Sequence, residues 1–199
     1  LEREDPRDAF VSPSYTCLED LPLGAVVGTS SLRRTVLLRA LRPDLQIEPL
    51  RGNLDTRLRK LDEGQYQAIV LAASGLKRLE LQSRIRTIFE PEQMLPAAGQ
   101  GALGIEVATG RPELVQALQT LVHMPTWLRV TAERAVSRTL GGSCSMPLAA
   151  YATLDGDQLH IRAAWGDAEA AQVQLVTAET SGTVSTLEQA DALGVQVAQ

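Results

Sequence analysis

The sequence predicts an α/β protein made of two units, and two observations support this. Between residues 25 and 79, short apolar runs alternate three times with amphipathic segments across short links, which is typical of a mixed, mainly parallel sheet wrapped by helices. After residue 148 the pattern changes to strict alternation on either side of Asp155-Gly156-Asp157, a strong hairpin signal. The second unit is therefore expected to be a small α+β domain with a three-stranded antiparallel sheet.

The first unit follows a polar, turn-rich segment, Leu1–Leu23, that we interpret as a connector. Ser31 and Asn53 are suitable N-caps for two helices, which should stop at Pro43 and Gly64. A third, short helix is expected near Leu76–Leu79. The three expected strands are Ala25–Thr29, Leu45–Leu50 and Ala68–Leu71.

The middle of the chain is glycine-dense. Ala97–Glu106 predicts a turn that leads into a strand, and helices are expected over Pro112–Val122 and Thr126–Leu140, the latter ended by Gly141. In the second unit the expected strands are Ala149–Leu154, Leu159–Trp165 and Val173–Thr177, with a helix over Leu187–Val197. Leu159, Ile161 and Ala163 should point inward, because they alternate with polar residues.

The charge distribution points to an anionic ligand. The net charge is −5, yet residues 31–60 carry eight basic and three acidic side chains. Arg33 and Arg34 lie in the first turn after the first strand, and Arg51 and Arg57 follow the second strand, at the strand ends where open α/β sheets bind ligands. Arg39, two turns into its helix, is expected to be solvated.

Arginine binds carboxylates through paired hydrogen bonds, so a ligand with several carboxylates suits this cluster. Phosphate would satisfy the same physics, but neither glycine-rich phosphate-binding motif occurs in the sequence. Nucleic acid is disfavoured because the basic segment has no aromatic residue for base stacking and the chain is acidic overall.

Other classes of site find little support. His123, His160 and Cys144 have no zinc-ligand spacing, so we expect no metal site. No serine nucleophile motif is present either, which disfavours a serine hydrolase. No apolar run approaches the roughly 20 residues that span a bilayer. Cys17 is interpreted as incidental, and two cysteines make a disulfide framework a weak alternative to a reducing, cytosolic setting.

Cys144 lies in the unusual stretch Thr139-Leu-Gly-Gly-Ser-Cys-Ser-Met-Pro-Leu148. The glycines let the backbone leave a helix sharply, which would place the thiol on an open loop. A small buried cysteine behind a helix cap is the alternative, and on this stretch alone it is favoured.

Taken together, the motifs resemble those of the hydroxymethylbilane synthase (porphobilinogen deaminase) family. The matching segments span nearly the whole chain in the family's order: Arg3–Phe10, Gly28–Arg34, Leu50–Asn53 with Thr56–Leu58, Ala73–Leu79, Pro96–Glu106, Thr131–Arg134 and Leu140–Cys144 with Pro147. One departure is that the family usually has Gly-Gly-Cys directly, whereas here Ser143 stands between Gly142 and the thiol.

The resemblance implies head-to-tail condensation of four porphobilinogen units with release of ammonia, on a dipyrromethane cofactor bound through a thioether to Cys144. The resemblance also implies that five further residues bind this cofactor: Thr29, Ser31, Arg33, Arg34 and Arg57. Substrate contacts are implied for Arg51, Asn53, Arg57, Arg78 and Gln100.

The resemblance also implies three domains. Residues 7–95 match the family's second domain, with a periplasmic-binding-protein-like fold; residues 96–123 match a hinge and a strand and helix that return to the first domain; residues 124–199 match the third domain. The family's catalytic aspartate, in a His-Ser-x-Lys-Asp segment, has no match here, so we expect a fragment that is inactive alone, with no catalytic residue of its own and an unmodified Cys144. A cytoplasmic monomer is expected, without a membrane or nucleic-acid partner.

A non-catalytic binding module for a small polycarboxylate remains the alternative. The cysteine loop separates the two hypotheses, because a binding module does not need an exposed thiol beside glycines.

Overall fold

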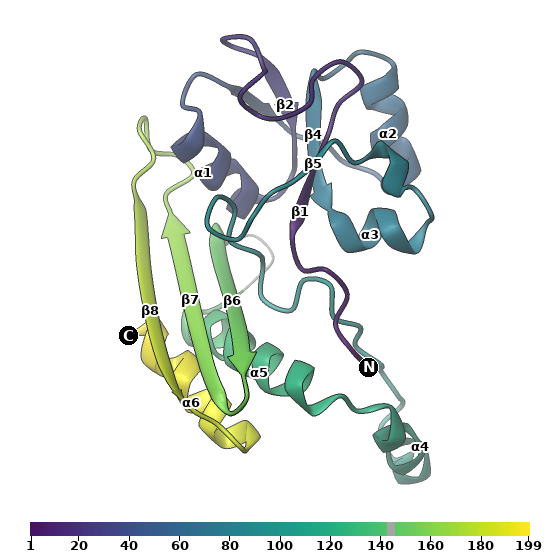
Figure 1. Ribbon diagram of the computed structural model, residues 1–199, viewed down its shortest axis with the longest axis vertical. Helices are drawn as coiled ribbons and strands as arrows, with labels where there is room; N and C mark the ends of the chain where they lie inside the picture. Colours follow the sequence, from purple (N-terminus) through teal and green to yellow (C-terminus); the bar gives the residue numbers. More distant parts are fainter. Residues whose placement is uncertain (143–145) are drawn as a thin grey trace.

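The computed structural model describes residues 1–142 and 146–199, and over these it contains two sheets, each with its own helices (Figure 1). The first sheet has five strands in the order β3-β2-β4-β1-β5 and the second has three in the order β6-β7-β8. The strands of the first sheet are β1 (Asp8–Val11), β2 (Val26–Gly28), β3 (Gln46–Glu48), β4 (Ala68–Ala72) and β5 (Thr87–Ile88).

The first sheet is mixed, as predicted. β2 pairs in parallel with β3 and β4, whereas β1 pairs antiparallel with β4 and with β5. β1 corrects one prediction, because Leu1–Leu23 was expected to be only a connector. Its four residues are all buried, and Asp8 lies opposite Ala72 at the end of β4.

The helices of the first unit begin where the caps predict. α1 (Leu32–Leu41) starts after Ser31 and α2 (Leu54–Asp62) after Asn53, and in each case the cap side chain accepts a hydrogen bond from the backbone N–H three residues on. α3 (Ala73–Arg78) and a 3-10 turn, Gln82–Arg84, complete the unit.

Alternate residues of the strands fill two hydrophobic cores, one on each face of the sheet. Phe10 and Val27 pack with Val36 and Leu38 of α1, and a T-shaped contact joins Phe10 to Phe89. On the opposite face, Val11 and Ile69 pack with residues of α2 and α3 that include Leu58, Leu61 and Leu76. Even-numbered residues of β1 thus face α1, and this places the side chain of Asp8 on the α1 side.

The second unit has the predicted elements in the predicted order, although its third strand begins later and extends further than the expected Val173–Thr177. β6 (Leu148–Asp155) and β7 (Gln158–Gly166) form the expected hairpin, with Gly156 at φ 59° in the turn, and β8 (Leu175–Thr183) follows as the third strand. Leu159, Ile161 and Ala163 are buried, as the alternation predicts. They pack beneath α5 (Met124–Thr139) and α6 (Leu187–Ala198). Gly141 ends α5 with φ 78°.

The connection between the units departs from the prediction in one respect. The strand expected within Ala97–Glu106 does not form: the chain turns at residues 98–101, and residues 102–107 have no regular secondary structure and no strand pairing to any described residue. A strand forms only where a neighbour satisfies its backbone groups, and none does so here. The expected helix is shorter, as α4 (Pro112–Leu118) followed by a 3-10 turn, Gln119–Leu121, and it projects at one end of the molecule (Figure 1).

The two units pack directly on each other through α1, which contacts β6, β7 and β8. Arg39 contributes to this packing. Its guanidinium donates to the carbonyls of Ala168 and Ala170, each at 2.7 Å. The prediction that Arg39 is solvated is therefore wrong: a helix position that faces away from its own sheet faces the second unit instead.

Candidate carboxylate-binding site

The predicted basic cluster lies beyond the carboxyl ends of β2, β3 and β4. Thr29 and Ser31 follow β2, and the backbone N–H of Ser31 donates to the Thr29 hydroxyl at 3.2 Å. This turn places Arg33 and Arg34 in the first turn of α1. The local sequence thus brings two guanidinium groups to one edge of the sheet, as expected.

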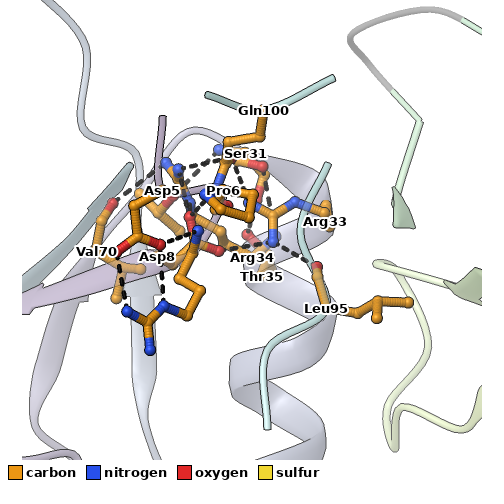
Figure 2. A network of polar contacts seen from close by, with 12 residues as sticks. Asp5, Pro6, Asp8, Ser31, Arg33, Arg34, Thr35, Val70, Leu95 and Gln100 are labelled. Carbon is orange, nitrogen blue, oxygen red and sulfur yellow. Dashed lines mark hydrogen bonds and ion pairs between the residues drawn. The ribbon is translucent and has the colours of Figure 1, made fainter. Parts of the chain in front are cut away.

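These two arginines are buried rather than open to solvent, with exposed fractions of 3% and 8%. Both converge on the carboxylate of Asp8, which is completely buried (Figure 2). Arg33 Nη1 donates to Asp8 Oδ2 at 2.7 Å, while Arg34 Nε and Nη2 donate to Asp8 Oδ1 at 3.0 and 2.7 Å. Arg33 Nη1 also donates to the Leu95 carbonyl at 2.8 Å and Arg34 Nη1 to that of Val70 at 3.3 Å.

Gln100 completes this network from the glycine-dense turn. Its Nε2 donates to Asp8 Oδ1 at 2.9 Å and to the Pro6 carbonyl at 2.5 Å, and its Oε1 lies 3.2 Å from Arg33 Nη2. Close by, Gly101 has φ 86°, and a Cβ there would lie 2.4 Å from the Glu4 carbonyl oxygen. Only glycine permits this approach of the turn to the N-terminal segment.

The electrostatics follow from one acid facing two bases. Burial alone would raise the pKa of Asp8, but Arg34 and Arg33 overcome that effect and hold the pKa at about 2. Asp8 is therefore a carboxylate at neutral pH. Burial lowers the pKa of Arg33, and the proximity of Arg34 lowers it further, although Asp8 opposes both effects. Two guanidinium groups against one carboxylate leave the network with a net positive charge.

One donor of this network has no acceptor. Arg33 Nε is buried and makes no hydrogen bond to any residue of the described ranges 1–142 and 146–199. Buried donors are nearly always paired in folded proteins. Together with the net positive charge, this marks the network as a place where an anion would be stabilised.

The remaining predicted residues lie on more accessible parts of the same edge. Asn53 acts as the N-cap of α2, and Arg51 is exposed beside it. Arg57 is partly exposed, and its Nε donates to the Gly52 carbonyl at 2.8 Å. Burial and then the charge of Arg34 lower the pKa of Arg57, which places its guanidinium in the field of the buried pair. Arg78 Nη2 donates to the Gly101 carbonyl at 2.7 Å.

The structure thus joins Arg33, Arg34 and Gln100 directly. Among the interactions of the described residues, Arg51, Asn53 and Arg78 make no hydrogen bond to Arg33, Arg34 or Gln100. Cys144, the predicted cofactor attachment point, lies outside the described residues. Asp8 was not predicted as a site residue. Its one local signal is an acidic residue directly before the apolar run Ala9–Val11.

A second buried ion pair lies near the site and holds distant segments together. Glu133 of α5 accepts from Arg3 Nη1 and Nη2 at 2.6 and 3.1 Å. It also accepts from the backbone N–H groups of Gly99 at 2.7 Å and Ala152 at 2.9 Å. The Arg3 guanidinium lies 5.5 Å from the ring centroid of Tyr151. This cluster fixes the glycine-dense turn that carries Gln100.

Two further properties bear on the class of site. None of the helices in the described residues is both long and apolar enough for a membrane span. Within the same residues, His, Cys, Asp and Glu side chains do not gather in groups of three that could hold a metal ion.

Comparison with known proteins places this arrangement in a family. Residues 1–116 match the family described as "Porphobilinogen deaminase, dipyromethane cofactor binding domain", and residues 127–199 match "Porphobilinogen deaminase, C-terminal domain". Among curated relatives, the porphobilinogen deaminase of Albidiferax ferrireducens is 68% identical over 198 residues, covering 100% of this chain and 62% of the relative. The proteins of the same name from Paraburkholderia phymatum and Ralstonia nicotianae are 56% and 58% identical, with 60% and 59% of their lengths covered.

The chain thus spans about three fifths of the length of these relatives. Two family matches, over residues 1–116 and 127–199, cover nearly all of it. The chain belongs to the porphobilinogen deaminase family.

Proposed function

We propose that this chain is the part of a hydroxymethylbilane synthase that holds the dipyrromethane cofactor and the growing pyrrole chain. The whole enzyme would be a transferase of tetrapyrrole biosynthesis that condenses four porphobilinogen units head to tail and releases ammonia at each step. The observation that carries the proposal is the buried Asp8–Arg33–Arg34 network, which retains a net positive charge and an unpaired donor in a member of this family.

The chemistry of the ligand suits this site. Each pyrrole unit carries an acetate and a propionate, and guanidinium groups bind carboxylates with strong, directional hydrogen bonds. Arg51, Arg57 and Arg78 would bind the carboxylates at the accessible edge, supported by Asn53 and Gln100. Thr29 and Ser31 would contact the cofactor from the turn after β2, next to Arg33 and Arg34.

The residues fit a covalently held dipyrromethane, because Arg33 Nε is a buried donor that no described residue satisfies and a cofactor carboxylate would satisfy it. When bound, the dipyrromethane supplies the free pyrrole α-position at which the chain grows. The protein's share is to hold its carboxylates, and the thioether would be formed by Cys144.

We also propose the family's domain boundaries for this chain, with residues 7–95 as the second, periplasmic-binding-protein-like domain, 96–123 as the hinge and returning segment, and 124–199 as the third domain. Exposed apolar side chains in the middle segment support this. Leu103, Ile105 and Val115 are 49–56% exposed and, with Trp127 of α5, border a groove of about 600 Å³. Apolar surface of this kind marks an interaction site, here for another part of the longer protein. We also propose that the protein is a monomer located in the cytoplasm.

Turnover requires groups that these residues do not supply. Release of ammonia needs proton transfer and stabilisation of a cationic pyrrole intermediate, and arginine holds its proton and repels a cation. Asp8 cannot supply the proton transfer either, because four hydrogen bonds occupy its carboxylate and its pKa is about 2. We therefore expect the 199 residues to bind porphobilinogen without converting it, and the catalytic aspartate to come from a segment upstream of Leu1 in the longer enzyme.

The test compares two proteins. One is the 199-residue chain, and the other is a chimera in which this chain replaces the matching part of the A. ferrireducens relative, which is 68% identical to it. After incubation with porphobilinogen, the chimera should form hydroxymethylbilane and the chain alone should not. Intact mass should show an unmodified Cys144 in the chain alone and an added dipyrromethane in the chimera. Binding by both without turnover by the chimera would favour a non-catalytic polycarboxylate-binding module instead.

Arg57 provides a residue-level test in the same chimera. Arg57→Ala should lower kcat/KM by about 10- to 100-fold, because losing a charge-assisted hydrogen bond costs on the order of 1.5–3 kcal/mol. The control is Arg59→Ala two residues along α2, where the side chain is 64% exposed and pairs with Glu63 on the surface. Equal losses in both variants would show that Arg57 does not face the ligand.

A further inference from the structure

We infer that Asp8 is a positioning residue of the carboxylate site. It holds the guanidinium groups of Arg33 and Arg34 in fixed orientations and leaves Arg33 Nε as the donor for a ligand carboxylate. This inference rests on the proposed function, since it concerns the same site.

The fold delivers Asp8 to the site through the one strand that runs against the parallel set. Because β1 is antiparallel to β4, its first residue lies opposite Ala72, the last residue of β4. The amino end of β1 therefore reaches the same sheet edge as the carboxyl ends of β2, β3 and β4. Its backbone is held on both sides of Asp8, by Ala73 N to Arg7 O at 3.0 Å and Phe89 N to Asp8 O at 2.9 Å.

The carboxylate orients each arginine differently. Arg34 places two donors on Oδ1, whereas Arg33 places one donor on Oδ2 and directs the rest of its Nη groups to Leu95 and Gln100 (Figure 2). Arg34 is thus anchored along one side of its guanidinium, and Arg33 through its outer nitrogens. The Nε of Arg33 is left over by this arrangement.

The Arg3–Glu133 ion pair, also buried, shows what a purely structural pair looks like. Glu133 faces one arginine, Arg3, and its remaining contacts are neutral backbone N–H groups, so the charges balance. Asp8 faces two arginines, and one donor stays without an acceptor among the described residues. An excess positive charge with a free buried donor is costly unless an anion completes it.

Gln100 is a partly exposed member of the network. This side chain is only half-buried, and its Oε1 is the acceptor of Arg33 Nη2 at 3.2 Å. Ser31 and Arg57, at the same sheet edge, are also partly exposed, so we place the approach of a ligand carboxylate at these residues. A ligand carboxylate arriving there would meet guanidinium groups that Asp8 already holds in place, so little ordering would remain to be done on binding.

The first experiment needs no substitution. In the 199-residue chain, the Nε–H resonances of the arginines are assigned by ¹⁵N NMR and porphobilinogen is titrated in. The Arg33 Nε–H resonance should shift in step with that of Arg57. Movement of Arg57 without Arg33 would overturn the inference while leaving the proposed function standing. No movement of any arginine would overturn both.

The second experiment tests Asp8 itself. Asp8→Asn should weaken porphobilinogen binding at least 10-fold and abolish the slow solvent exchange of the Arg33 and Arg34 Nε–H groups, and Asp8→Glu should restore part of the affinity. Asp44→Asn is the matched control: Asp44 forms a bidentate pair with Arg42 just beyond α1, at 2.8 Å for both contacts, and lies outside the site. It should bind within twofold of the unmodified chain. Binding by Asp8→Asn within twofold as well would refute the inference, and if that variant does not fold, the NMR titration decides.

Discussion

Replacement of Glu133 by glutamine should destabilise the protein strongly, because its carboxylate joins four parts of the chain. It is completely buried on α5 and accepts hydrogen bonds from Arg3, Gly99 and Ala152. Glutamine has nearly the same shape and keeps one acceptor oxygen, so the packing would change little. The change removes the negative charge opposite the Arg3 guanidinium.

The magnitude follows from the burial of both partners. The side chain of Arg3 is 1% exposed and that of Glu133 is 0% exposed, so the arginine would be left charged without a counter-ion. Breaking a buried ion pair in this way costs about 3–5 kcal/mol. Whole domains are stable by only about 5–15 kcal/mol. For a chain of this length, where 1 kcal/mol moves Tm by about 2–4 °C, Tm should fall by roughly 6–20 °C.

Urea unfolding of the 199-residue chain measures the effect. Glu63→Gln is the control, because Glu63 pairs with Arg59 on the surface of α2 and its loss should cost less than about 0.5 kcal/mol. Adding Arg3→Met to Glu133→Gln should recover part of the stability, since the unpaired buried charge disappears. A loss below about 1 kcal/mol for Glu133→Gln, or no recovery in the double variant, would show that the pair is not held as described.

Two further predictions concern Asp8 and Arg39. The pKa of Asp8 is 3.8 in an unfolded chain and about 2 when folded, so its contribution of about 2 kcal/mol is present above pH 4 and lost as pH falls from about 4 to 2. The difference in unfolding free energy between the unmodified chain and Asp8→Asn should therefore shrink over that range; a constant difference would contradict this. Arg39→Ala removes the hydrogen bonds to Ala168 and Ala170, so it should cost about 1–3 kcal/mol of unfolding free energy and speed proteolysis of residues 167–174. Arg59→Ala is the control, and equal effects of the two changes would show that Arg39 does not hold this segment.

The elements predicted correctly are those with local signals. Ser31 and Asn53 start helices because their own side chains accept a nearby N–H, and Asp155-Gly156-Asp157 turns the chain because Gly156 adopts a positive φ. Each signal lies within a few residues of the structure that it produces. Such features can be read from the sequence without knowledge of the rest of the fold.

The strands that were misjudged depend on distant partners. β1 forms because Val11 and its neighbours pair with β4, almost 60 residues further along the chain. The stretch 102–107 has a comparable apolar pattern, but the described residues offer it no strand to pair with. Apolar periodicity identifies a segment that is able to form a strand, and the neighbour decides whether it does so.

The same distinction applies to the site. The sequence placed the arginines at the correct sheet edge, because helix caps and strand ends are local features. It could not show that Arg33 and Arg34 turn inward to Asp8, since that contact depends on the antiparallel register of β1 against β4. The arginine cluster therefore contains two kinds of residue. Arg33 and Arg34 are buried and give the site its positive charge, whereas Arg57 is partly exposed and accessible to a ligand. The Asp8 carboxylate holds both buried arginines in place. Substituting Asp8 therefore affects both of them at once, and tests the site more directly than removing any single arginine.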